Sequence, residues 1–117
     1  MDKEEMKIRT KKFALRVIRL VESLPQGRTV DVIGSQLLRC GTSVGANYRS
    51  ACRARSRADF ISKMGIVEEE TDESLYWMQM VIDAELLPEK RLNDLMNEAD
   101  EILAITVSSI KTARKNK

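Results

Sequence analysis

The sequence contains no histidine, and among its 117 residues it has only two cysteines and two prolines. The lack of histidine excludes the commonest general base, the Ser–His and Cys–His nucleophile pairs and most zinc and di-iron sites. Five Gly and two Pro are too few for a β-sandwich or barrel, which needs turn residues every ~8–12 positions. The five aromatic residues (one Trp, two Tyr and two Phe) are also few for such a fold. No apolar run approaches the ~18 residues of a membrane span, and the charged residues 1–12 lack the core of a signal peptide. We therefore expect a cytoplasmic protein that crosses no membrane and carries no cofactor.

The two cysteines, Cys40 and Cys52, fall within one segment of helical periodicity. On a continuous helix they would lie ~18 Å apart, whereas a disulfide needs Cα atoms within ~7 Å. We expect both to pack as small core residues rather than to bridge each other.

Apolar residues recur with helical i, i+3, i+4 spacing in four segments, at about residues 2–24, 29–54, 57–86 and 88–113. Short connections between segments of this length place consecutive helices side by side and antiparallel. The sequence therefore predicts an all-α fold, an antiparallel up-down four-helix bundle, in which residues 1–117 form a single domain. The basic residues that end the chain are expected to fray.

The breaks between the four segments carry helix-boundary signals. Residues 25–27 (Pro-Gln-Gly) end the first segment, and Thr29 or Asp31 is the predicted N-cap of the second. Residues 56–59 have the spacing of a capping box that opens the third segment. Pro88 suits the first helical position of the fourth.

Charge is distributed unevenly along the chain. Residues 25–57 hold six basic and one acidic side chain, and residues 58–86 hold one basic and eight acidic side chains. Within the basic segment, four arginines fall within ~80° of arc opposite the apolar stripe: Arg39, Arg49, Arg53 and Arg57. Such a face can contact phosphates, so these residues are the candidate site for binding RNA or DNA. An ordinary solvated face, or an ion-pair surface against the acidic segment, would give the same pattern. The next candidates are two terminal clusters: Lys7, Arg9, Lys11 and Lys12, and Lys111, Arg114 and Lys115.

Two further features suggest close helix contacts. Gly34, Gly41 and Gly45 lie on one border of the second segment's apolar stripe, and glycine costs ~0.5–1 kcal/mol in a helix interior. They indicate a closely approaching helix, of the same chain or of another. The third segment has a second apolar strip, made of Ile66, Trp77 and Met80, away from its core face. We expect a homo-oligomer whose interface includes Gly41, Gly45 and this strip; alternatively, Trp77 covers one end of the bundle.

The acidic run of the third segment contains Glu69, Glu70 and Glu73 in an E-E-x-x-E pattern. On a helix these carboxylates can share a magnesium ion. The pattern resembles the first motif of the all-helical nucleotide pyrophosphohydrolases, whose second motif is E-x-x-D. Residues 98–101 offer Glu where that motif has Asp. We expect no enzyme, no catalytic residue and no metal site, and keep a magnesium-dependent nucleotide pyrophosphohydrolase as the alternative.

One known family shares several stretches of this sequence. Residues 36–47 read Q-L-L-R-C-G-T-S-V-G-A-N and resemble the Q-L-x-R-S-G-T-S-I-G-A-N stretch of a four-helix-bundle family. Its members are often named 23S ribosomal RNA intervening-sequence proteins. The likeness continues through residues 48–51, 56–63 and 69–77, where the family has x-x-E-A, S-x-x-D-F-I-x-K and K-E-A-D-E-T-x-Y-W-L. Cys40 replaces the family's Ser, and Ser50 replaces a common Glu, which leaves this helix more basic.

The resemblance implies a left-handed four-helix bundle, often assembled as a ring-like pentamer, with no established catalytic activity. Some relatives are encoded inside ribosomal RNA genes, and others resemble accessory proteins of diversity-generating retroelements, which pair with a reverse transcriptase and bind nucleic acid through a basic surface. We therefore expect a non-enzymatic oligomeric bundle that binds RNA or DNA. Besides the enzyme, a protein-binding adaptor without nucleic-acid affinity remains an alternative.

Overall fold

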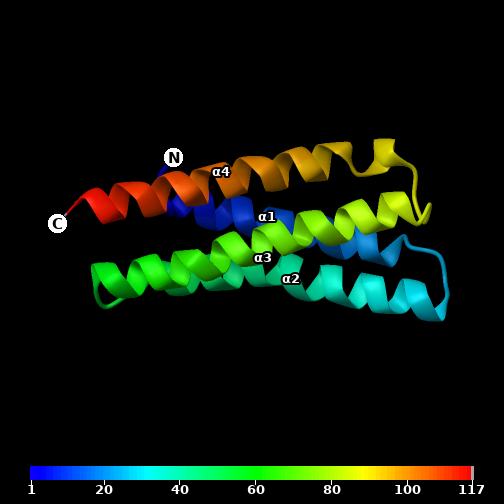
Figure 1. The fold of residues 1–117 in the computed structure, drawn as a ribbon, viewed down its shortest axis with the longest axis horizontal. Helices are drawn as coiled ribbons and strands as arrows, with labels where there is room; N and C mark the ends of the chain where they lie inside the picture. Colours follow the sequence, from blue (N-terminus) through cyan, green and yellow to red (C-terminus); the bar gives the residue numbers. More distant parts are fainter. Residues whose placement is uncertain (117) are drawn as a thin grey trace.

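Four long helices joined by short connections form an antiparallel bundle, with both chain ends at the same end of the bundle (Figure 1). The computed structural model describes residues 1–116. The helices are α1 (Lys3–Glu22), α2 (Arg28–Cys52), α3 (Arg57–Asp83) and α4 (Asn93–Lys115), and the short 3-10 helix η1 (Glu89–Arg91) precedes α4. The prediction of an all-α up-down bundle is confirmed. Lys117, the last residue of the predicted domain, lies outside the described residues.

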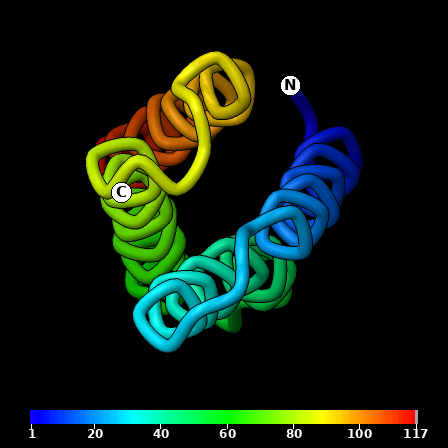
Figure 2. Tube along the Cα trace, turned by 90° about the vertical axis from the view of Figure 1, so that its right-hand side faces the viewer, coloured from blue at the N-terminus to red at the C-terminus, as the bar shows by residue number. Residues whose placement is uncertain are grey.

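Seen along its axis, the bundle places each helix beside the next one in sequence, and α1 and α4 stand apart on the fourth side (Figure 2). The contact between α2 and α3 is the most extensive, and the contact between α1 and α4 is the sparsest. The side that joins the two ends of the chain is thus the least tightly packed. No helix within residues 1–116 is long and apolar enough to cross a membrane.

The core is built from one apolar stripe on each helix. Phe13, Leu37, Met64 and Ile102 are among its largest fully buried side chains. Three buried threonines enter the core because each hydroxyl donates to the carbonyl oxygen four residues earlier, at 2.7–2.9 Å: Thr10, Thr71 and Thr106. Burial is therefore compatible with these polar groups, since each of the three hydroxyls has a partner.

Both cysteines are free, as the sequence predicts. Cys40 is fully buried, and its sulfur accepts from the Ser74 hydroxyl at 3.3 Å. Burial, the largest influence, raises the pKa of the Cys40 thiol, which keeps it protonated. Cys52 is half-buried in the last turn of α2.

The helix boundaries correct two sequence predictions at the start of α2 and the end of α3. The N-cap of α2 is Gly27 (φ 154°), not Thr29 or Asp31, because only glycine readily adopts that backbone. The helix α3 ends at Asp83 rather than at residue 86. Glu85 takes a left-handed φ of 58°, and the Leu86 amide donates back to the Val81 carbonyl at 2.9 Å, which satisfies the helix end.

The other two boundaries concern α3 and α4. Ser56 caps α3 as predicted, accepting from the Asp59 amide at 3.0 Å, while the Asp59 carboxylate accepts from the Arg55 amide at 3.1 Å. Pro88 does not begin α4: it is extended (ψ 146°) and precedes η1, so α4 starts five residues later, at Asn93. At its other end α4 continues to Lys115, beyond the predicted end at about residue 113, and the fraying of the basic tail stays a prediction.

The glycines of α2 face α1 of the same chain. A Cβ atom at Gly41 would lie 2.7 Å from Val17 Cγ1, and one at Gly45 would lie 3.4 Å from the Thr10 carbonyl carbon. At Gly34 the nearest atom would be Leu24 Cδ1, at 3.2 Å. The close approach predicted from the sequence is therefore the packing of α1 on α2. These contacts within one chain account for the glycines, and the assignment of Gly41 and Gly45 to an oligomer interface stays a prediction.

This packing predicts opposite effects for alanine at two helical glycines. Gly41→Ala should lower the free energy of unfolding by about 1–2 kcal/mol, because Val17 is β-branched and cannot rotate away from the new methyl group. A Cβ atom at Gly65 would meet no other described residue within 4 Å, so Gly65→Ala should raise the free energy of unfolding by about 0.5–1 kcal/mol. Urea unfolding followed by circular dichroism measures both changes. Equal effects at the two sites would contradict the packing.

Candidate nucleic-acid interface

A basic groove runs between the first half of α1 and the second half of α2. Its volume is about 470 Å³. Two pairs of cationic side chains border it, Lys7 and Lys11 from α1 and Arg49 and Arg53 from α2. The remaining lining residues are Ile8, Ala14, Thr42, Gly45 and Ala46. No carboxylate lines this groove within the described chain, so its border carries a net positive charge. We call it the basic groove.

Small residues on both helices create the groove. Gly45 allows the α2 backbone to come close to α1 at Thr10, and the short side chains of Ala14 and Ala46 leave open space between the two helices. The cations on each helix are four residues apart, so each pair spans about 6 Å along its helix. Long basic side chains thus stand on either side of a floor of short ones, an arrangement that suits a phosphate backbone lying along the groove.

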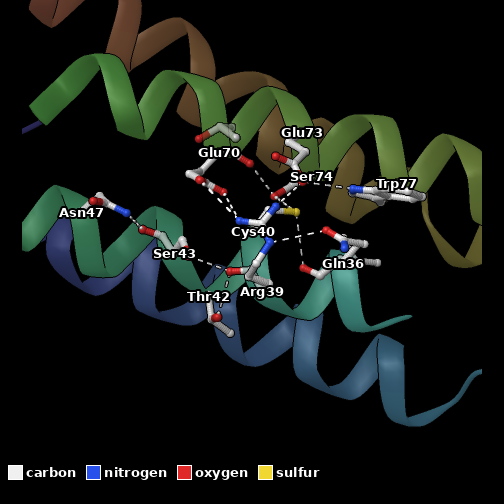
Figure 3. Close-up of polar contacts among 12 residues, drawn as sticks. Gln36, Arg39, Cys40, Thr42, Ser43, Asn47, Glu70, Glu73, Ser74 and Trp77 are labelled. Carbon is white, nitrogen blue, oxygen red and sulfur yellow. Dashed lines mark hydrogen bonds and ion pairs between the residues drawn. The ribbon is translucent and has the colours of Figure 1, made fainter. Parts of the chain in front are cut away.

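The structure corrects the predicted arginine face, because Arg39 does not lie with Arg49 and Arg53. Its guanidinium turns toward α3, where Nη1 lies 3.1 Å from Glu70 Oε2 and Nη2 donates to Glu73 Oε2 (Figure 3). The ion-pair surface that the sequence left open as an alternative therefore applies to Arg39.

Arg57, the fourth predicted arginine, is the first residue of α3 and follows the turn that separates α3 from the end of α2 at Cys52. Its Nη1 donates to the carbonyl oxygen of Asn116 at the end of α4. Arg57 therefore belongs to a different corner of the bundle. Of the four predicted arginines, the structure brings only Arg49 and Arg53 to the basic groove, where they meet two lysines from α1.

The N-terminal cluster also divides. Lys7 and Lys11 line the basic groove, and the Lys7 ammonium lies 3.2 Å from the exposed Glu4 carboxylate. Arg9 instead turns toward α4 and forms two hydrogen bonds of 2.7 Å with the Glu98 carboxylate. Glu101 lies 3.4 Å from the same guanidinium. Arg9 is therefore neutralised, and a phosphate would have to displace a carboxylate to reach it.

These ion pairs also describe the acidic residues considered for an enzyme. Glu70 and Glu73 bind Arg39, whereas Glu69 borders a groove between α3 and α4 together with Glu68 and Asp72. The three carboxylates of the E-E-x-x-E pattern therefore face two different sides of α3. Within residues 1–116 no group of three or more potential ligand residues could hold a metal ion.

The apolar strip predicted as an oligomer interface lies on α3. Ile66 is 40% exposed, and Trp77 and Met80 are half-buried. The indole of Trp77 packs partly against the core and edge-on to Tyr76, with ring centroids 5.0 Å apart. Its Nε1 donates to Glu73 Oε2 at 3.2 Å. Trp77 is thus fixed beside the Arg39 ion pairs, and the role of the strip in assembly remains a prediction.

Trp77, the single tryptophan of the chain, can report the ionisation of Glu73. Burial acts to raise the pKa of Glu73, but hydrogen bonds from Arg39 and Trp77 and the Arg39 charge lower it below its ordinary value of 4.5. The stabilisation from this carboxylate is therefore complete above about pH 4.5 and is lost as the pH falls through the lower, folded-state pKa. A fluorescence titration should show its midpoint below pH 4.5, and Arg39→Gln should raise it. The same midpoint in Arg39→Gln and in the remote control Arg28→Gln would refute this assignment.

The fold and this surface define a class: a small all-helical bundle with a basic groove between its first two helices. The model of the 23S rRNA-intervening sequence protein family matches residues 3–108, and the chain belongs to that family. A solved structure of a protein with unknown function, from the S23 ribosomal protein family of Bacteroides thetaiotaomicron VPI-5482, is 36% identical, with a TM-score of 0.87. The match covers 95% of this chain and 99% of the other. A comparison with curated proteins finds no match.

Proposed function

We propose that this protein is a non-enzymatic, cytoplasmic, oligomeric bundle that binds RNA or DNA through the basic groove. The observation that carries the proposal is the meeting of Lys7, Lys11, Arg49 and Arg53 around one groove that no carboxylate of the described residues lines. Cations at this density bind phosphates without reading base sequence. The family's name, which refers to ribosomal RNA, agrees with such a ligand.

The charge distribution gives the bundle one basic side and one acidic side. In the order around the bundle, the groove between α3 and α4 lies across from the basic groove, and it is bordered by Glu68, Glu69 and Asp72 (Figure 2). Phosphates are repelled from this acidic side and attracted to the other. Because no aromatic side chain of residues 1–116 lines the basic groove, base stacking should contribute little and sequence preference should be weak. A role as an accessory to a reverse transcriptase or to a ribosomal RNA element fits a sequence-independent contact of this kind.

Binding of a structured RNA hairpin and of duplex DNA, measured by fluorescence anisotropy at ~50 and ~200 mM salt, tests the proposal. Four phosphate contacts give a slope of about −3.6 in log K against log salt for duplex DNA, so the affinity should fall about 100-fold between the two conditions. Failure to bind either ligand at the lower salt concentration would refute the proposal. Binding that does not change with salt would refute the phosphate contacts.

We further propose that the protein assembles with copies of itself, as a pentamer by family resemblance, through the strip that includes Ile66. Sedimentation at tens of micromolar should give a multiple of the 13.3 kDa chain mass, and Ile66→Glu should shift the protein toward the monomer because a charge would be buried in the contact. The matched control is Leu15→Glu, which changes an equally exposed aliphatic residue on α1. A monomeric parent protein would exclude the assembly, and an equal effect of the two substitutions would place the contact elsewhere.

A further inference from the structure

A second groove, separate from the basic groove, lies between α1 and the start of α4. Its volume is about 290 Å³, and its floor is formed by the buried side chains of Leu20 and Leu95. Three arginines and one carboxylate complete the lining: Arg16, Arg19, Arg91 and Asp94. We call it the arginine groove. It occupies the sparsely packed side of the bundle, near the end opposite to the chain termini (Figure 1).

The arginines of this groove are not neutralised by the protein. Arg91 Nη2 donates to the neutral Ser23 hydroxyl at 3.0 Å, and in the described part of the chain none of the three guanidinium groups forms an ion pair. Arg9 and Arg39 show how this chain treats arginines that serve its own fold, because each of them binds two glutamates. The arginine groove instead holds an excess of positive charge at fork-shaped donors that suit phosphate.

The two grooves share α1 as a common wall and open on its two flanks. Lys7 and Lys11 face α2 across the basic groove, and Arg16 and Arg19 face η1 and α4 across the arginine groove. The midpoints of these two pairs are about 13 Å apart along the helix, and an α-helix with its side chains is about 10–12 Å wide. The outer surface of α1 between them carries the exposed Lys12. A single flexible strand that crosses α1 obliquely therefore reaches both grooves.

We propose that the arginine groove is a second phosphate-contact site for the same nucleic acid, and that the preferred ligand is a single strand long enough to cross α1. This inference rests on the proposed function, because it places one end of the strand in the basic groove and the other end in the arginine groove. A strand that fills only the basic groove gains nothing from the second site. A longer strand gains the contacts of both.

A length series tests this assignment. Fluorescein-labelled oligouridylates of about 4 to about 16 nucleotides cover the usual site sizes of single-strand-binding domains. Affinity for the parent protein should rise steeply once the strand crosses α1. Arg16→Gln/Arg19→Gln should lower the affinity for the longest strand about 10-fold, and should reduce the magnitude of its salt slope by about 1.4, since each single-strand contact contributes ~0.7. The affinity for the shortest bound strand should change less than about 2-fold.

Two further variants make the result independent of damage to the fold. Asp94→Asn removes the carboxylate of the arginine groove, so it should raise the affinity for the longest strand and leave the shortest unchanged. The control Arg28→Gln/Lys63→Gln removes two charges outside both grooves and should have no length-dependent effect. If Arg16→Gln/Arg19→Gln behaves like this control at every length, the inference fails while the proposed function stands. If the parent protein binds the RNA hairpin or duplex DNA but no single strand, the inference fails and the proposed function stands; if it binds none of them, both fail. If a polyglutamate peptide competes with the same length dependence, the occupant is an acidic protein segment and the inference is overturned.

Discussion

Reversing the charge of Arg49 and Arg53 should lower the affinity for RNA and duplex DNA by about 100-fold or more. Each arginine supplies a charge-assisted contact worth about 1.5–3 kcal/mol, and a glutamate in its place repels the phosphate. The salt slope of residual duplex binding should fall by about 1.8, because two of the four contacts are removed. Both side chains are exposed at the border of the basic groove, so Arg49→Glu/Arg53→Glu should leave the helical circular dichroism signal unchanged.

The matched control is Arg28→Glu/Lys63→Glu, which changes the net charge by the same amount outside the groove. If binding depended on overall charge alone, the two double variants would lose equal affinity. A weaker loss in the control locates the site in the basic groove. Unchanged affinity in a folded Arg49→Glu/Arg53→Glu variant would exclude the groove and direct attention to the terminal basic residues, such as Arg114.

The four helices could be predicted from the sequence because local signals determine them. The apolar stripes repeat with the period of a helix, and Ser56 caps α3 where its spacing with Asp59 says it should. Two of the boundary errors lie at Gly27 and Glu85, where the backbone takes a positive φ, and a third lies at Pro88, which precedes η1 instead of opening α4. At Gly27 the side-chain signals of neighbouring residues suggested a later start, and at Glu85 a non-glycine residue occupies a left-handed position that the sequence does not reveal.

The basic groove was half predictable. Periodicity places Arg39, Arg49 and Arg53 on the outer half of α2, but it does not say which neighbouring helix each flank meets, because that depends on the three-dimensional order of the helices. In the structure Arg39 falls on the α3 flank and Arg49 on the α1 flank. The glycines mark how α1 and α2 align along their length. In this antiparallel pair Gly34 contacts Leu24, and the later glycines of α2 contact earlier residues of α1.

The closing of the bundle could not be predicted from local patterns at all. Arg9 and Glu98 are 89 positions apart, and nothing in either helix marks the other as its partner. Their pairing depends on the full topology, which brings α4 back beside α1. For the same reason, the arginine groove does not show in the charge pattern of α1 alone: Arg91 joins Arg16 and Arg19 only after the chain has folded.

This pairing carries the second large effect, on stability. Arg9 and Glu98 are 22% and 16% exposed, and two hydrogen bonds of 2.7 Å join them across the most sparsely packed side of the bundle. Arg9→Ala should lower the free energy of unfolding by about 2 kcal/mol, because it leaves the half-buried Glu98 carboxylate without its partner. Glu101, which is 66% exposed and 3.4 Å from Arg9, should contribute less than about 0.5 kcal/mol.

Substitutions at the same positions separate charge from geometry. Arg9→Lys keeps the charge but loses the paired hydrogen bonds, so its stability should fall between those of the parent protein and Arg9→Ala. In a double-mutant cycle of Arg9→Ala with Glu98→Ala, measured by urea unfolding, the losses should not add, because either substitution alone removes the interaction. Additive losses would show that the two side chains stabilise α1 and α4 separately. The α1–α4 side of the bundle would then depend on its apolar contacts, and Arg9 would be free to bind phosphate.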